Sequence, residues 1–264
     1  MSGRLGGKIA IVTGAGSRGP GLGNGKATAI LFAREGAKVL CVDQMKERAE
    51  ETVEAIRGEG GEAVAHAADV TRAAECAAMV KAAADRWGGV DILHNNVGIE
   101  SRKGLLDTTE AEWDRVITVD LKSMFLATQA AVPAMARRGG GAVICVSSIA
   151  GLRGYGRTAY ATAKAGVIGF VRSVAVQFGP KGIRVNAIAP GPVWTPMVQD
   201  LGPEARERRR RASPLATEGS GWDIGWGAVY LASDEARWVT GQTLIIDAGL
   251  TVTTPEGSLG SEPR

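Results

Sequence analysis

The sequence is poor in three residue types that often define a site. Among its 264 residues only 5% are aromatic, and there are two histidines and three cysteines. Cys41, Cys76 and Cys145 are odd in number and far apart, so they predict reduced core thiols of a cytoplasmic protein and exclude a disulfide framework. His66 and His94 form no cluster with metal-ligand spacing. We therefore expect no metal site.

Long apolar runs and an excess of charge are also missing. No stretch approaches the ~20 apolar residues that a membrane helix needs, and the segment Met1 to Lys8 lacks the apolar core of a signal peptide. The net charge of +3 is too small to indicate nucleic-acid binding. These absences leave a small-molecule partner as the expectation, with neither a membrane nor nucleic acid involved.

Short apolar runs alternate with amphipathic segments along nearly the whole chain. The runs predict strands at Lys8–Thr13, Ala37–Val42, Glu62–His66, Val90–His94, Ala142–Ser147, Ile183–Ile188 and Thr243–Asp247. Helices are expected at Lys26–Arg34, Glu47–Arg57, Ala73–Trp87, Glu110–Arg137 and Thr158–Phe178. Repeated β-α-β units predict an α/β fold, a Rossmann-type doubly wound parallel sheet of about seven strands with helices on both faces. Residues 1–250 form one expected domain, and 251–264 a polar C-terminal tail.

A glycine-rich segment follows the first expected strand and leads directly into a helix. Glycines at this turn let the backbone approach a diphosphate, and the helix N-terminus supplies free N–H groups. The expected cradle consists of Gly14, Ser17, Gly23, Asn24 and Gly25.

Asp43 ends the second expected strand. A carboxylate there accepts hydrogen bonds from the adenosine ribose, and its charge opposes a 2′-phosphate. Gln44 follows where an NADP site often has a cation. The expected cofactor is therefore NAD.

Tyr160 and Lys164 are four residues apart on an expected helix, one turn above each other. A phenol has an ordinary pKa of about 10, and a neighbouring ammonium favours its ionised form. A tyrosine tuned in this way can exchange a proton with an alcohol oxygen.

With several further motifs in order, the chain resembles the classical short-chain dehydrogenase/reductase family over roughly residues 5 to 250. The motifs are Thr13-Gly14, Asp43, Asp69-Val70, Asn95-Asn96-Val97-Gly98, Ser147-Ser148, Tyr160 with Lys164, Asn186, Pro190-Gly191 and Thr195. The resemblance implies an NAD-dependent oxidoreductase that interconverts a secondary alcohol and its ketone, and a homotetramer.

The resemblance also implies a role for each matching residue. Tyr160 would be the general acid/base, Ser148 would orient the substrate oxygen, with Ser147 as the alternative, and Lys164 would lower the Tyr160 pKa and bind the nicotinamide ribose. The remaining cofactor contacts would come from Asp69 and Val70 at the adenine, Asn96, Val97 and Gly98 at the ribose, and Pro190, Val193 and Thr195 at the nicotinamide.

The chain departs from the family pattern at four places. The glycine loop is longer: either Arg18 to Leu22 are inserted, or Gly19 and Gly21 form the second glycine pair and the first helix is longer. Val97 replaces an alanine. Asp120 stands where the family usually has an asparagine that holds a water in a proton relay to the lysine. The segment between Ser148 and Tyr160 is one residue shorter, near Tyr155.

The expected substrate pocket is largely apolar and consists of Leu152, Gly154, Tyr155, Trp194 and Met197. A 3-oxoacyl thioester reductase is an alternative within the family, and a non-catalytic NAD-binding module is an alternative outside enzymes. The basic run Arg206–Arg211 is either a solvated helix or a flap that meets an anionic substrate tail.

Small residues on the two long expected helices predict close packing at a tetramer interface. They are Ala127, Ala130, Ala131, Gly166 and Gly169. The other interpretation is that they pack only on the sheet.

Overall fold

Seven strands form one parallel sheet in the computed structural model, which describes residues 3–253. The strands are β1 (Ile9–Thr13), β2 (Lys38–Asp43), β3 (Ala63–Ala67), β4 (Ile92–Asn95), β5 (Gly141–Val146), β6 (Ile183–Pro190) and β7 (Thr243–Ile246). Their order across the sheet is β3-β2-β1-β4-β5-β6-β7. The fold class and all seven expected strands are thereby confirmed.

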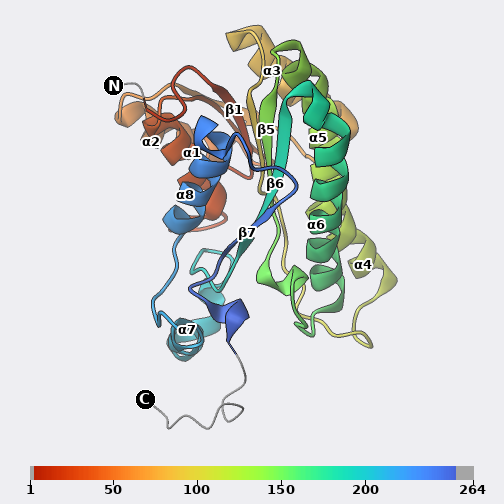
Figure 1. Cartoon of the computed structure of the whole chain (residues 1–264). Coiled ribbons are helices and arrows are strands. Elements are labelled where there is room, and N and C mark those ends of the chain that lie inside the picture. Colours follow the sequence, from red (N-terminus) through yellow and green to blue (C-terminus); the bar gives the residue numbers. More distant parts are fainter. Residues whose placement is uncertain (1–2, 254–264) are drawn as a thin grey trace.

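Both faces of the sheet are covered, because successive side chains of a strand point to opposite sides. In β1, Ile9 and Ile11 enter one core cluster while Ala10 and Val12 enter the other. One face carries α1 (Asn24–Arg34), α2 (Lys46–Gly58) and α8 (Gly221–Ala232); the other carries α3 (Ala73–Trp87), α5 (Ser123–Arg137) and α6 (Thr158–Phe178) (Figure 1). The three cysteines are free and buried in these layers.

The expected long helix over residues 110–137 is divided. It consists of α4 (Glu110–Ile117), a π-helical turn (Thr118–Lys122) and α5. Such wide single turns are frequent at functional sites. Here the turn holds Asp120, which is fully buried and faces α6.

Two helices lie beyond the five that the periodicity predicts. The first, α7 (Gly202–Arg211), contains the basic run and lies past the lower end of the sheet in Figure 1, apart from the helices on its faces. The second, α8, was missed because its sequence is rich in glycine. At Gly225 the glycine permits close packing on α1, since an added Cβ would lie 2.7 Å from the Leu31 Cδ1 atom.

The first residues of the expected C-terminal tail form a short turn in the structure. Leu250–Val252 form a short 3₁₀ turn, and the Thr251 N–H donates to the Asp247 carboxylate at 2.7 Å. The remainder of that expected tail, residues 254–264, lies outside the described part of the chain. None of the helices between residues 3 and 253 is long and apolar enough to cross a membrane.

Two of the small residues expected at a helix interface belong to the core instead. Ala127 and Ala131 are buried against the sheet. Gly166 is also enclosed, because a Cβ there would lie 2.7 Å from a Leu121 methyl group. Gly169, in contrast, has nothing within 4 Å of the place where a Cβ would lie.

Candidate active site

A cleft of about 450 Å³ opens at the carboxyl ends of the strands, where the strand order reverses between β1 and β4. This is the position at which open α/β sheets bind ligands. Every residue expected at the cofactor lines it: Gly14, Ser17, Gly23, Asn24, Gly25, Asp43, Gln44, Asp69, Val70, Asn96, Val97, Gly98, Pro190, Val193 and Thr195. Asp120, Ser148, Tyr160 and Lys164 line the same cleft.

The glycine loop is closely fitted to the neighbouring strand ends. A Cβ on Gly25 would lie 2.0 Å from the Gly14 carbonyl oxygen, so only glycine fits. The Asn96 amide donates to that carbonyl at 3.1 Å, and the Asn96 N–H donates to Thr13 Oγ1 at 3.1 Å. These contacts aim the N-terminus of α1 at the cleft, as a diphosphate-binding turn requires. The residues present therefore fit a dinucleotide.

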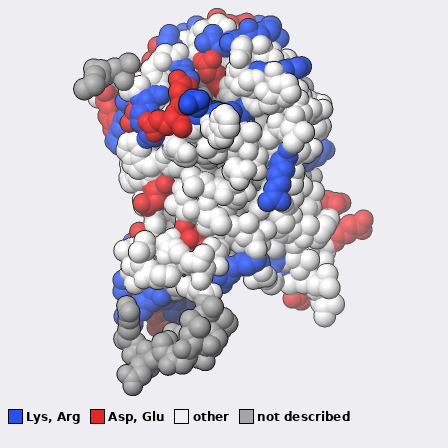
Figure 2. All heavy atoms as spheres, viewed as in Figure 1, with Lys and Arg blue, Asp and Glu red and all other residues white. Residues whose placement is uncertain are grey.

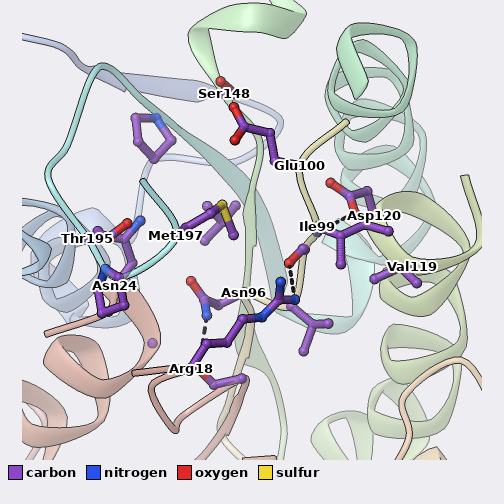
Figure 3. A pocket seen from close by; sticks show the side chains of 18 of the residues that line it. Arg18, Asn24, Asn96, Ile99, Glu100, Val119, Asp120, Ser148, Thr195 and Met197 are labelled. Carbon is purple, nitrogen blue, oxygen red and sulfur yellow. Dashed lines mark hydrogen bonds between the residues drawn. The ribbon is translucent and has the colours of Figure 1, made fainter. Parts of the chain in front are cut away.

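The inserted part of the loop reaches across the cleft. One terminal nitrogen of Arg18 donates to the Gly98 carbonyl at 2.9 Å (Figure 3). The Gln199 side chain donates to the Pro20 carbonyl at 2.9 Å. The insertion thus joins the glycine loop to two segments that border the rest of the cleft.

Asp43 is held at the far end of the cleft by backbone donors. Its two carboxylate oxygens accept from the Gly16 N–H at 3.2 Å and the Met45 N–H at 3.0 Å. Within residues 3–253 it forms no ion pair, although Arg48 lines the cleft beside it. Its negative charge is therefore available to a ribose.

Lys164 and Asp120 form a buried ion pair next to the phenol. The Lys164 Nζ lies 3.2 Å from Asp120 Oδ2 and 5.7 Å from the centroid of the Tyr160 ring. Burial disfavours the ammonium, but Asp120 and Tyr160 outweigh it, so the pKa of Lys164 lies above its ordinary value. The second Asp120 oxygen accepts from the Ile99 N–H at 2.8 Å. Lys164 is thus held as a cation.

The structure distinguishes the two adjacent serines. Ser147 is buried, and its hydroxyl donates to the Lys164 carbonyl at 2.7 Å. Ser148 lines the cleft and lies away from Arg18 in Figure 3, and among the described residues its hydroxyl accepts only from the Ala150 N–H at 3.1 Å. Ser148 is therefore the serine with a hydroxyl available to a ligand.

Three of the five residues expected at the substrate do not line the cleft. Leu152 and Gly154 are exposed in the loop before α6, and Trp194 stacks beneath the Arg206 guanidinium at 4.8 Å. Only Tyr155 and Met197 border the cleft as expected. The expectation differs from the structure for two reasons: Leu152 and Gly154 face solvent in the shortened loop, and Trp194, in the loop after β6, packs on Arg206.

Charged residues take the place of that apolar lining. Glu100, Arg157 and Arg209 line the same cleft, and Arg157 forms an ion pair with Glu100. Arg157 precedes Tyr160 by three residues, about one helical turn, and this spacing could have indicated it. No sequence signal distinguishes Arg209 from its basic neighbours, because the whole run is polar.

This sheet order, with a glycine-rich first βα turn and a cleft at the switch point, defines the Rossmann-type class of dinucleotide-binding proteins. Residues 21–251 match the family profile described as enoyl-(acyl carrier protein) reductase. The chain belongs to the short-chain dehydrogenase/reductase family.

Three similar proteins illustrate the range of the family. The chain is 40% identical over 250 residues to the 3-oxoacyl-(acyl-carrier-protein) reductase FabG of Thermotoga maritima, covering 94% of this chain and 100% of that one. A Burkholderia xenovorans protein assigned to the short-chain dehydrogenase/reductases has a TM-score of 0.91 at 41% identity, covering 96% and 99%. A 7α-hydroxysteroid dehydrogenase in complex with NADH and 7-oxo glycochenodeoxycholic acid has a TM-score of 0.88 at 36% identity, covering 93% and 95%. The protein is accordingly an oxidoreductase of an alcohol and ketone pair.

Proposed function

We propose that the protein is an NAD-dependent dehydrogenase/reductase that interconverts a secondary alcohol and its ketone. One observation carries the proposal. Tyr160, Ser148 and the Lys164–Asp120 ion pair border a single cleft together with the glycine loop and Asp43. A proton-transfer group and a dinucleotide site therefore share one space.

Each of these side chains has a defined task. The Ser148 hydroxyl donates a hydrogen bond to the substrate oxygen and fixes its position. Tyr160 takes the hydroxyl proton during oxidation and returns it during reduction. The nicotinamide cofactor, when bound, accepts or supplies the hydride.

Lys164, held by Asp120, stabilises the ionised form of the Tyr160 phenol. The ammonium stabilises the Tyr160 oxygen while that oxygen carries negative charge. Asp120 keeps the ammonium charged and fixes the loop through the Ile99 N–H. The carboxylate replaces the family's asparagine in a proton relay that we expect to remain intact.

NAD is the proposed cofactor because the Asp43 carboxylate repels a 2′-phosphate. The similar hydroxysteroid dehydrogenase holds NADH. Equal affinity for NADPH and NADH in fluorescence titrations would contradict the preference.

Replacing Tyr160 with phenylalanine tests the catalytic assignment. We expect kcat for ketone reduction to fall by about 10²- to 10⁴-fold, the usual contribution of a general acid, while the Kd for NADH stays the same. Tyr230→Phe, on α8 and outside the cleft, is the matched control. Undiminished turnover by the Tyr160 variant would rule out this residue as the acid.

A 3-oxoacyl thioester reductase is the second candidate, supported by the name of the Thermotoga maritima relative. Faster turnover of a 3-oxoacyl thioester than of any simple ketone would favour it. If NADH binds but neither a 3-oxoacyl thioester nor a simple ketone is turned over, the non-catalytic NAD-binding module would be favoured.

We propose a homotetramer in the cytoplasm. The apolar side chains Phe125 on α5 and Val176 on α6 are exposed, which supports contacts between copies along these helices. The free buried cysteines agree with a reducing compartment. A monomer in sedimentation analysis would refute the assembly, and an intramolecular disulfide in the purified protein would oppose the location.

A further inference from the structure

Arg209 differs from every other arginine of α7. Figure 2 shows positively charged side chains gathered over this helix. The neighbouring arginines each meet a carboxylate: Arg206 pairs with Glu218, Arg208 with Glu204, and Arg210 and Arg211 with Glu207. Arg209 has no ion pair with any described residue, and its Nε atom is buried without an acceptor.

The protein nevertheless fixes Arg209 in place. One terminal nitrogen donates to the Val193 carbonyl at 3.3 Å, and Arg206, one turn earlier, stacks on Trp194. Both contacts tie α7 to the loop that follows β6. The guanidinium is therefore positioned at the cleft before any ligand binds.

Arg209 lies at the end of the cleft that contains Tyr160 and Ser148. Arg209 lines the cleft together with Tyr155, Tyr160 and Ser148. Burial lowers the pKa of its guanidinium, and Tyr155, Arg102, Glu218 and Tyr160 are near enough to influence it, although none of them forms an ion pair with it. A partly buried cation without a carboxylate partner is a costly arrangement that an anionic ligand relieves.

The charged side chains around Arg209 carry one more positive than negative charge. Arg102 and Arg157 share Glu100, and Arg102 also pairs with Asp200. Together with Arg209 and the neighbouring Arg206–Glu218 pair, four guanidiniums face three carboxylates. A ligand with a single negative charge neutralises this group, whereas a dianion would meet repulsion from Glu100.

We propose that Arg209 binds a carboxylate of the substrate, so that the enzyme acts on a hydroxy acid and the matching oxo acid. A guanidinium is the side chain best suited to hold a carboxylate in a fixed orientation. The inference rests on the proposed function, since it assigns the second polar group of a substrate whose carbonyl meets Ser148 and Tyr160.

Oxo acids compared with their methyl esters test this assignment. The series consists of acetoacetate, levulinate and 5-oxohexanoate, each beside its methyl ester, with kcat and KM measured for the wild type, Arg209→Gln and Arg208→Gln. Arg208 is the matched control because it carries the same charge one residue away, is 73% exposed and pairs with Glu204. Titration with NADH monitors the cofactor site in each variant.

We expect the wild type to favour at least one acid over its ester by about tenfold in kcat/KM. Arg209→Gln should remove that preference, mainly by raising KM for the acid much more than KM for its ester, whereas Arg208→Gln keeps the wild-type pattern. Turnover of esters or neutral ketones with no acid favoured would overturn the inference alone. Failure to reduce any ketone would overturn the proposed function as well.

Competition between anions separates a carboxylate from a phosphate of a thioester carrier. Inhibition by acetate that disappears in Arg209→Gln supports the carboxylate. Stronger inhibition by inorganic phosphate, lost in the same variant, would assign the charge to a phosphate and overturn the carboxylate.

Discussion

The two ends of the cleft are built in different ways. At the cofactor end, backbone contacts decide the shape: Gly25 fits against the Gly14 carbonyl, and Asp43 is held by two backbone N–H groups. At the substrate end, long charged side chains from α6, α7 and the loop after β4 decide it, with Glu100, Arg157 and Arg209 facing one space.

The difference teaches which kind of site a sequence reveals. A turn built from glycines depends on local backbone geometry, so its motif stays within one short segment. A pocket built from side chains of distant loops depends on how those loops turn. The charge of such a pocket can therefore change while the fold stays the same.

Gly25→Ala is expected to have the largest effect at the cofactor end. The added methyl group would lie 2.0 Å from the Gly14 carbonyl and force the glycine loop away from α1. We expect NADH affinity to fall by at least about a hundredfold, equivalent to about 2.7 kcal/mol. Isothermal titration with NADH measures it.

Gly19→Ala in the same loop is the matched control, because its added Cβ meets nothing within 4 Å. Equal losses in both variants would show that the loop as a whole, and not the contact at Gly25, holds the cofactor.

His94 tests whether the core beneath the cofactor end is sensitive to acid. Its ring is fully buried and lies edge-on to Phe32, with 6.1 Å between the ring centroids, and neither nitrogen has a hydrogen-bond partner among residues 3–253. Burial lowers the pKa of His94 to about 3. Below pH 6.5 the unfolded chain therefore gains a proton that the folded chain does not, and stability falls as the pH drops toward 3.

The free energy of unfolding should fall by about 2 kcal/mol between pH 7 and pH 5 on account of His94. Urea unfolding of His94→Leu should lack this loss, whereas His66→Gln, at a partly exposed site, should keep most of it. The same acid sensitivity in the leucine variant would exclude His94 as its source.

Asp43→Asn should have the smallest effect, and it should change only the choice between NADH and NADPH. Removing the charge should improve NADPH binding relative to NADH by about tenfold, or about 1.4 kcal/mol. Asp69→Asn removes a charge elsewhere in the cleft, where Asp69 already accepts from Thr71. Similar shifts in both variants would point to overall charge and away from the ribose contact.

The sequence predicts the sheet, and the expected cofactor residues all line one cleft, for a physical reason. Apolar runs of parallel strands and glycines at a βα turn are both local signals. The π-helical turn at Asp120 is not local, because it depends on the pairing of that carboxylate with Lys164 and the Ile99 N–H. The position of Trp194 likewise depends on a stacking partner, Arg206, from a later helix.

The inserted loop also has a kinetic consequence. Pro20 is bound by Gln199, which lies three residues before the start of α7, and Arg18 is bound to Gly98. We expect a dinucleotide to displace these contacts when it arrives or leaves, and the Gln199 contact links that displacement to the segment just before α7, which carries Arg209. We therefore expect an ordered reaction in which the nucleotide binds first and departs last, with its release setting the pace of turnover.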